Sequence, residues 1–296
     1  MKRHNAEILL LVITILWAGT FAIIKSAVAD VNPSMFLLLR FSIAAVIGVA
    51  IWPKSLFALD RDTTGKGLIL GLLFGLGFLL QTIGLTLTTA STSAFITGTM
   101  VVFVPIVHRI VDGSKIRANH AASIVLVLIG LYLFTSPEAH GVNLGDVLTL
   151  VSAIFWAIYL TYIDVWTTAM RANVQRQNAL VLLQFITTIA IAAFGVGISG
   201  IRGESLAVTL DIDLLLGLFY CGIFASLIPT FIQTRYQQYT HPVRAGVIFA
   251  IEPLAASVIA WLAINEQFSV RQLIGGGVLM LAIILPDVIA QVRTPR

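Results

Sequence analysis

The sequence predicts an all-α integral membrane protein of ten transmembrane helices, arranged as two inverted five-helix repeats around a central cavity. Three observations support this fold class. Hydrophobic residues make up 58% of the 296-residue chain and charged residues only 11%, whereas a soluble domain carries about 25% charged residues. The apolar residues fall into ten consecutive segments, and the second five segments repeat the first five. Because each repeat holds an odd number of spans, the second must lie upside down relative to the first.

The ten segments are separated by short connectors in which the charged residues gather. Each segment is close to the ~20 residues that a helix needs to cross about 30 Å of hydrocarbon. In chain order they are Ile8–Val28, Pro33–Trp52, Gly67–Leu87, Ser91–Val111, Ala118–Thr135, Leu144–Ile163, Asn178–Ser199, Leu214–Gln233, Pro242–Ala263 and Gln272–Ala290. The connectors are too short for a soluble domain, so we expect one integrated membrane domain.

Lysine and arginine residues are distributed unequally between the two sets of connectors. If the N-terminus is cytoplasmic, only Arg202 and Arg271 lie on the outer side. The residues on the inner side are then Lys2, Arg3, Lys54, Arg61, Lys66, Lys115, Arg117, Arg171, Arg176, Arg235, Arg244, Arg293 and Arg296. Because cytoplasmic connectors carry an excess of Lys and Arg, we expect a multi-pass protein of the bacterial inner (plasma) membrane with both termini cytoplasmic. The net charge of +4 then reports orientation, and no nucleic-acid partner is expected.

The second half of the chain repeats the first in four stretches that follow the same order. The matches are Glu7–Trp17 with Asp146–Trp156, Leu37–Phe41 with Val181–Phe185, Gly67–Gly71 with Asp213–Gly217, and Thr92–Pro105 with Thr240–Pro253. Each match is weak alone, but four in order, with Trp, Gly and Pro in register, indicate a duplication. We expect one repeat over residues 7–135, an inverted repeat over residues 144–290, and their join near residues 136–141.

Glycines and prolines fall at matching positions of the two repeats. Gly98 and Pro105 on the fourth segment match Gly246 and Pro253 on the ninth. Proline removes a backbone donor and tends to kink a helix, so these four residues are candidate hinges, with fixed kinks as the alternative.

A row of glycines also recurs every fourth residue on the third segment, at Gly67, Gly71 and Gly75. Such rows let helix backbones approach closely in lipid. The row is compatible both with a sliding interface between the halves and with static packing.

Aromatic and small polar residues lie near the middle of several segments, whereas lipid-facing Trp and Tyr usually collect at the membrane interface. An aromatic lining with a few polar groups suits a small, partly apolar ligand. The candidate substrate-binding residues are Trp17, Thr20, Phe78, Gln81, Thr99, Trp156, Tyr159 and Phe224. The alternative for each is ordinary packing between helices.

Three ionisable residues inside the segments are further candidates: Arg40, Glu252 and Lys25. A charge inside a membrane protein must face the bundle interior or water, and it is a functional-site hypothesis by default. Arg40 or Lys25 could hold a substrate carboxylate, and Glu252 could hold an ammonium group or a coupling proton. The alternatives are a structural pair of Arg40 with Glu252, and a Lys25 side chain that reaches the membrane interface.

Several of these residues form a pattern that resembles the EamA-type proteins of the drug/metabolite transporter superfamily. The pattern comprises Leu16–Phe21 with Lys25, Pro33 followed by Arg40-Phe41, and His241–Pro253 followed by Asn265-Glu266. The first repeat departs from it, because Val104-Pro105 replaces Glu-Pro and Asp112-Gly113 stands near the expected terminal Glu, which leaves open whether that half supplies an acidic coupling group. The resemblance implies ten helices, inverted repeats of five, and export of small metabolites by alternating access. Among members, the chain looks most like the YddG-type bacterial amino-acid exporters.

The sequence favours a secondary transporter over other functional classes. It contains no Walker ATP-binding motif, His-Glu-x-x-His, Cys-x-x-Cys or Gly-x-Ser-x-Gly pattern, so we expect no ATP motor, no enzyme, no metal and no cofactor. A multiply charged substrate would need several cations in the cavity. We therefore expect a monomer that exports amino acids, including aromatic or apolar ones, with a proton as the candidate coupling ion. The alternatives are a channel or facilitator, a lipid scramblase, a structural scaffold, and a transporter of drugs or nucleotide-sugar-like metabolites.

Overall fold

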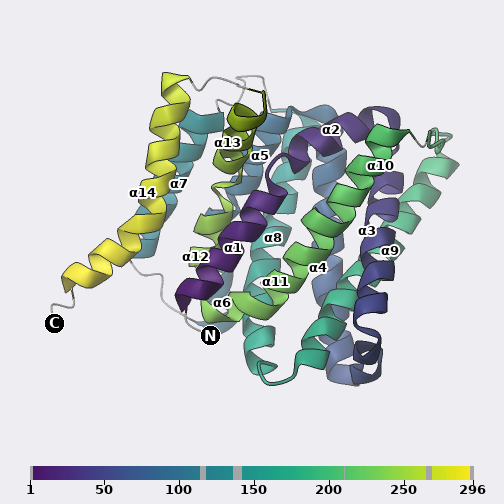
Figure 1. Ribbon diagram of the computed structural model, residues 1–296, viewed down its shortest axis with the longest axis horizontal. Coiled ribbons are helices and arrows are strands. Elements are labelled where there is room, and N and C mark those ends of the chain that lie inside the picture. Colours follow the sequence, from purple (N-terminus) through teal and green to yellow (C-terminus); the bar gives the residue numbers. More distant parts are fainter. Residues whose placement is uncertain (1–2, 114–117, 136–141, 210, 265–268, 294–296) are drawn as a thin grey trace.

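The computed structural model of the protein describes residues 3–113, 118–135, 142–209, 211–264 and 269–293, and these residues form an all-helical bundle (Figure 1). The expected join at residues 136–141 and the Asn265-Glu266 pair lie outside the described residues. The elements are α1 (Arg3–Trp17), α2 (Thr20–Asp30), α3 (Pro33–Ile51), η1 (Pro53–Ala58), α4 (Arg61–Leu87), α5 (Ala90–Gly98), α6 (Met100–Asp112), α7 (Ala118–Thr135), α8 (Leu144–Ala169), α9 (Val174–Ile201), α10 (Ile212–Phe219), η2 (Tyr220–Leu227), α11 (Ile228–Tyr236), η3 (Gln237–Tyr239), α12 (Pro242–Phe249), α13 (Glu252–Ile264) and α14 (Val270–Arg293).

Every apolar segment of the sequence falls on one helix or on consecutive helices. Among the described residues, seven helical stretches are long and apolar enough to cross a membrane: Arg3–Asp30, Pro33–Ile51, Arg61–Leu87, Ala90–Asp112, Leu144–Ala169, Val174–Ile201 and Ile212–Tyr239. Ala121–Thr135 and Val270–Leu285 are shorter apolar helices. Large apolar side chains such as Val46, Ile110 and Phe194 are exposed on the outside of the bundle, which is the surface expected of a protein solvated by lipid.

Most helices begin at a side chain that accepts hydrogen bonds from the first free backbone N–H groups. Asn32 accepts from Ser34 and Met35 at the start of α3, where Pro33 occupies the first helical position. A reciprocal capping box of Asn143 and Asp146 starts α8. These caps satisfy donors that helix ends leave unpaired, so the sequence fixes the helix boundaries locally.

The helices of the two halves are interleaved. α7 and α14 pack together at one edge of the bundle, and α3 and α9 pack together toward the other (Figure 1). Between these edges α4 packs against both α8 and α9, and α1 packs against α11 and α12. Because α4 and α1 come from the first half and their neighbours from the second, the core lies between the halves.

The glycine row of α4 allows a close approach of α4 to α9. A methyl group at Gly71 would lie 2.6 Å from Cβ of Thr187 and 3.1 Å from the backbone of Gln184, both on α9. A methyl group at Gly75 would likewise lie 3.1 Å from the backbone of Thr188. The row therefore forms a tight contact between the halves.

We expect Gly71→Ala to destabilise the protein by about 1–3 kcal/mol, because the added methyl group must push α9 away from α4. The matched control is Gly65→Ala on the same helix, where an added Cβ has no atom within 4 Å. That change should stabilise α4 slightly, since alanine favours a helix over glycine by about 1 kcal/mol. Thermal unfolding of the two purified variants measures the difference, and equal unfolding temperatures would contradict the tight contact.

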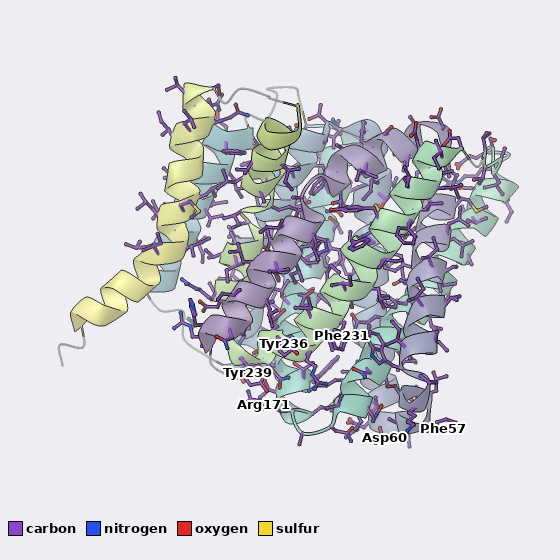
Figure 2. The ribbon with its side chains drawn as sticks, in the orientation of Figure 1. Phe57, Asp60, Arg171, Phe231, Tyr236 and Tyr239 are labelled. Carbon is purple, nitrogen blue, oxygen red and sulfur yellow. The ribbon has the colours of Figure 1, made fainter. Side chains whose placement is uncertain are left out.

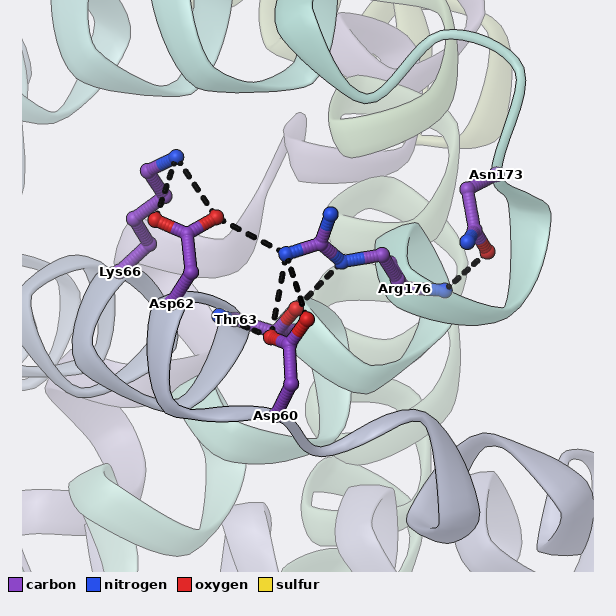
Figure 3. Close-up of polar contacts among 6 residues, drawn as sticks. All are labelled: Asp60, Asp62, Thr63, Lys66, Asn173 and Arg176. Atoms are coloured by element: carbon purple, nitrogen blue, oxygen red, sulfur yellow. Dashed lines mark hydrogen bonds and ion pairs between the residues drawn. The ribbon is translucent and has the colours of Figure 1, made fainter.

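Polar contacts join the halves at one end of the bundle, near the start of α4 (Figure 3). Arg176 at the start of α9 donates to Asp60 at 3.0 Å, to Asp62 at 2.8 Å and to the Thr63 hydroxyl at 2.6 Å. Lys66 contacts Asp62 at 2.9 Å. Asp60 also caps α4 by accepting the Thr63 backbone N–H at 2.7 Å. We call these five residues the α4–α9 ion cluster.

Other contacts close the same end. Figure 2 shows Arg171 and Tyr239 at this end together with Asp60. Arg171, in the turn between α8 and α9, donates to the Gln238 carbonyl at 2.9 Å and lies 4.7 Å from the centre of the Tyr239 ring. Glu7 of α1 accepts from Arg244 of α12 at 3.2 Å and from Thr240 at 3.1 Å. We call this the Glu7 end of the bundle.

The ion cluster predicts an acid-side loss of stability. The Thr63 backbone N–H holds the pKa of Asp60 below its usual value, with smaller contributions from the Thr63 hydroxyl and Arg176. A lowered pKa in the folded protein stabilises it above the pKa of the unfolded chain, and this contribution disappears as pH falls through the folded value. We expect the unfolding temperature to drop on acidification below about pH 4.

Asp60→Asn should reduce that acid-side drop, because asparagine keeps the cap but has no carboxylate to protonate. Melting curves of the parent and of Asp60→Asn over the same pH series test this. Because Asp60 is exposed, the effect should shrink further in high salt. An unchanged acid slope in the variant would rule out the cluster as its source.

Candidate substrate cavity

Four irregular helix centres meet in the middle of the bundle. α1 and α2 are separated at Gly19, whose φ of 84° is in the left-handed region. α5 and α6 are separated at Thr99, α12 and α13 at Ala250 and Ile251, and η2 is a stretch of π-helix between α10 and α11. Discontinuous helices near the midplane are a recurrent feature of transporter binding sites, because the unwound backbone leaves polar groups free.

A cavity lies among these irregular centres. Its lining residues are Trp17, Thr20, Phe21, Ile24, Arg40, Phe78, Gln81, Thr82, Leu85, Thr97, Met100, Trp156, Leu160, Gln233, Phe249 and Glu252. It encloses about 70 Å³, which is room for roughly five water molecules at ~10–15 Å³ each. Six of the candidate residues, Trp17, Thr20, Phe78, Gln81, Trp156 and Arg40, are therefore brought together with Glu252 from both halves of the chain.

Aromatic rings form two sides of this cavity. Trp17 of α1 meets Phe249 of α12 edge-on, with ring centres 5.2 Å apart. On α8, Trp156 meets Phe78 at 4.7 Å and Phe74 at 5.6 Å, both of α4. Edge-to-face contacts of this kind stabilise aromatic clusters. The cavity is thus mostly apolar, with rings held in fixed orientations.

Arg40 of α3 is the buried cation of the cavity, with only 1% of its surface exposed. Its Nε donates to the Ser226 hydroxyl at 2.8 Å and its Nη2 to the Ala225 carbonyl at 3.1 Å. Its guanidinium carbon lies 4.6 Å from the centre of the Phe78 ring. Within the described part of the chain, Nη1 is buried and has no hydrogen-bond partner.

The local sequence explains why a backbone carbonyl can hold this cation. Pro229 has no N–H to donate to the carbonyl of Ala225, four residues earlier. The Ala225 carbonyl instead accepts from both Arg40 and the Trp17 indole, the latter at 3.0 Å. In return, Tyr220 of η2 donates to the Leu16 carbonyl at 2.7 Å, next to the break between α1 and α2. The irregular centres of these helices thus satisfy each other's backbone groups.

Glu252 is the first residue of α13 and lies beside Thr20. A carboxylate at this position complements the partial positive charge of the helix N-terminus. None of the ion pairs among the described residues includes Glu252 or Arg40. The structural pair that the sequence allowed between these two residues is therefore not formed in this structure.

Four other candidate residues do not line the cavity. Lys25 donates to the carbonyls of Leu85 and Thr88 at 2.6 and 2.9 Å, and so caps the end of α4. Tyr159 lies behind Trp156, where its hydroxyl donates to Gln184 at 2.8 Å.

Thr99 and Phe224 lie elsewhere. The Thr99 hydroxyl donates to the carbonyl of Ile96 at the break between α5 and α6, at 2.5 Å. Phe224 is 37% exposed and lines a groove between α2 and α10, stacked on Tyr220. This groove opens on the outside of the bundle and is separate from the central cavity.

The candidate hinge residues lie at or near helix breaks in two of four cases. Gly98 is the last residue of α5, and Pro253 is the second residue of α13. Pro105 lies inside the continuous helix α6, and Gly246 lies inside α12. The left-handed Gly19 was not among the candidates, although a glycine directly after Trp17-Ala18 was a visible signal for a break.

Sequence reasoning also missed lining residues that become adjacent only in the fold. Thr97 accepts a hydrogen bond from Gln81 at 2.9 Å and so orients that amide. Gln233 and Phe249 reach the cavity from α11 and α12. Gln233 is a polar residue within an apolar segment and could have been found by that signal, whereas Phe249 carries no distinguishing pattern.

The chain is similar in sequence and in structure to known proteins. The profile of the EamA-like transporter family matches residues 4–136 and again residues 143–286. A protein of Archaeoglobus fulgidus named an uncharacterized transporter is 26% identical over 285 residues, covering 96% of this chain and 86% of that protein. An uncharacterized transporter of Clostridium kluyveri is 26% identical over 262 residues, covering 82% and 80%. A crystal structure of another protein superposes with a TM-score of 0.77 over 99% of both chains, at 17% identity, which indicates a shared fold.

Proposed function

Because the chain belongs to the EamA-like transporter family, we propose that it is a secondary transporter that exports amino acids and similar small metabolites by alternating access. Family membership makes the chain a multi-pass membrane transporter rather than an enzyme. The observation that carries the proposal is the central cavity, which combines aromatic sides with one buried cation and one carboxylate. Such a lining suits a small, partly apolar solute with few charges.

We propose that the two matches to the family profile correspond to two inverted five-helix repeats, giving ten spans in all. Support comes from the position of the cavity, which takes residues from both matched regions. Two contacts at the Glu7 end, Arg244 with Glu7 and Arg176 with Asp62, also join elements of the two regions. In alternating access, these contacts would break when the cavity opens at that end.

We further propose that the Glu7 end faces the cytoplasm of a bacterial inner membrane and that the protein acts as a monomer. The basic residues of the inner connectors support this orientation. Arg171 and Asp60 lie at one end of the bundle (Figure 2), and Arg176 contacts Asp60 there, as the expected topology requires. Labelling of the variants Lys54→Cys and Arg171→Cys with a thiol reagent in intact cells tests this orientation. If the two cysteines were labelled from opposite sides of the membrane, the topology would be contradicted.

Uptake into proteoliposomes tests the proposed activity. We expect saturable transport of neutral amino acids such as leucine and phenylalanine, with competition among them. Imposing a pH gradient separates coupled transport, which it accelerates, from facilitated diffusion, which it leaves unchanged. Flux that never saturates would identify a channel, and transport of phosphorylated sugars alone would refute the proposed substrates, since the cavity offers one buried arginine.

A further inference from the structure

We infer that the cavity selects zwitterions, binding a substrate carboxylate at Nη1 of Arg40 and a substrate ammonium group at Glu252. This inference rests on the proposed transport function and assigns the recognition of each charged group to one residue. The sequence left open whether Arg40 or Lys25 holds a carboxylate, and whether Glu252 faces an ammonium group. The contacts of these side chains distinguish among the alternatives.

Hydrogen bonds fix the Arg40 side chain but leave one of its nitrogen donors, Nη1, without a partner among the described residues. Ser226 and Ala225 take Nε and Nη2, and the Phe78 and Phe41 rings lie 4.6 and 5.2 Å from the guanidinium carbon. Nη1 remains buried without a partner among the described residues. Leaving a buried charged donor unpaired is costly, so a ligand that supplies an acceptor there gains a charge-assisted hydrogen bond.

Lys25 does not offer the same opportunity. Its ammonium group already contacts the carbonyls of Leu85 and Thr88 at the end of α4, and it is not among the residues that line the cavity. Among the described residues, Arg40 is thus the one cation that lines the cavity. A solute with several anionic groups would leave all but one of them without a cation.

Glu252 supplies the complementary charge. It lines the same cavity as Arg40 but forms no ion pair with a described residue. The cavity therefore presents a cation and an anion that are not in contact with each other. A zwitterion compensates both charges at once, whereas an amine or a carboxylic acid of the same size compensates only one.

The remaining lining fits the apolar part of such a solute. The aromatic residues Trp17, Phe78, Trp156 and Phe249 are among the lining residues. The free space of about 70 Å³ is smaller than leucine, so the rings must move to admit a solute of that size.

Three probes with the same apolar side chain test the inference. They are leucine, 4-methylpentanoate, which lacks the ammonium group, and 3-methylbutylamine, which lacks the carboxylate. Binding to the purified protein is followed by thermal stabilisation, and transport by uptake into proteoliposomes. We expect the parent protein to bind leucine at least about tenfold more tightly than either analogue, since a hydrogen bond to a charged group accounts for roughly 10- to 100-fold in affinity.

The variants should separate the two charges. Arg40→Gln should weaken leucine and 4-methylpentanoate by about 10- to 100-fold and leave 3-methylbutylamine unchanged. Glu252→Gln should weaken leucine and 3-methylbutylamine and leave 4-methylpentanoate unchanged. Arg202→Gln, which removes an exposed arginine outside the cavity, is the charge-matched control and should bind all three probes like the parent.

Two further variants guard against loss of folding. Arg40→Lys keeps the charge without the planar fork, and Ser226→Ala removes one support while keeping Arg40. Both should weaken leucine less than Arg40→Gln does. Equal binding of all three probes to the parent, or equal weakening of all three by Arg40→Gln, overturns the inference while leaving transport intact. If no neutral amino acid binds or is transported, the inference and the proposed substrates fall together.

Discussion

Replacing Trp156 with alanine is expected to lower amino-acid transport at subsaturating concentration by at least about tenfold and to destabilise the protein by about 3 kcal/mol. The Trp156 ring lines the cavity and meets Phe78, Phe74 and Tyr159 at 4.7, 5.6 and 5.8 Å between ring centres. Its removal takes away one apolar side of the cavity and three aromatic contacts at once. The loss should fall mainly on KM if, as we propose, the cavity that Trp156 lines is the substrate site.

A second tryptophan on the same helix provides the matched control. Trp166 of α8 is part-buried and packs against Tyr162 at 4.7 Å, but it does not line the cavity. Trp166→Ala should destabilise the protein without raising the KM for leucine. Trp156→Phe should recover most of the affinity, since a ring remains. Uptake kinetics of the three variants measure this, and an equal rise of KM in Trp156→Ala and Trp166→Ala would show that the effect is only structural.

Gly19→Val is expected to be the most damaging change at a position with no steric conflict. An added Cβ at Gly19 would have no atom within 4 Å, but the φ of 84° is one that a β-branched residue avoids. The strain of about 1–3 kcal/mol favours a continuous helix in place of α1 and α2. A continuous helix would move Trp17 and Thr20 relative to each other, so we expect transport to fall together with stability.

Two variants test whether the effect comes from backbone strain in general or from strain at Gly19 in particular. Gly19→Asn should retain most activity, because asparagine tolerates the left-handed conformation better than valine does. Gly203→Val introduces the same kind of strain at a φ of 73°, but in an exposed turn after α9. It should leave leucine uptake unchanged. If Gly203→Val impaired transport as strongly as Gly19→Val, the break between α1 and α2 would have no special role in the cavity.

Several of the candidate residues that line the cavity lie on regular helices, whereas Trp17, Thr20 and Glu252 flank helix breaks. Phe78 and Gln81 lie on one face of the continuous helix α4, and Trp156 lies on the continuous helix α8. Helical periodicity is sufficient to place such residues together. Arg40 was found by a different signal, because an arginine inside an apolar segment must be buried in the bundle interior.

Two of the candidate residues that do not line the cavity, Thr99 and Phe224, lie where the backbone is irregular. Phe224 matches Phe78 in the duplication and was expected in the cavity, but it lies in the π-helical η2. The wider π turn shifts the angular position of the residues along the helix, and Phe224 lies in the outer groove instead. In the same way, the break at Ala250 and Ile251 sets the direction of Glu252 and the residues that follow it. Such departures depend on tertiary contacts, which a repeat pattern does not contain.

The two regions that match the family profile each have a break, at Thr99 in the first and at Ala250 and Ile251 in the second, but they differ in their other irregular places. Gly19 interrupts the first apolar segment, while its counterpart in the second half belongs to the continuous helix α8. The π-helix η2 in turn corresponds to a continuous part of α4. If the two regions exchange roles during transport, no symmetry therefore makes the free energies of the inward-open and outward-open states equal. Since about 1.4 kcal/mol gives a tenfold population ratio, even a modest inequality would make the empty carrier rest facing one compartment and give the two half-cycles different rates.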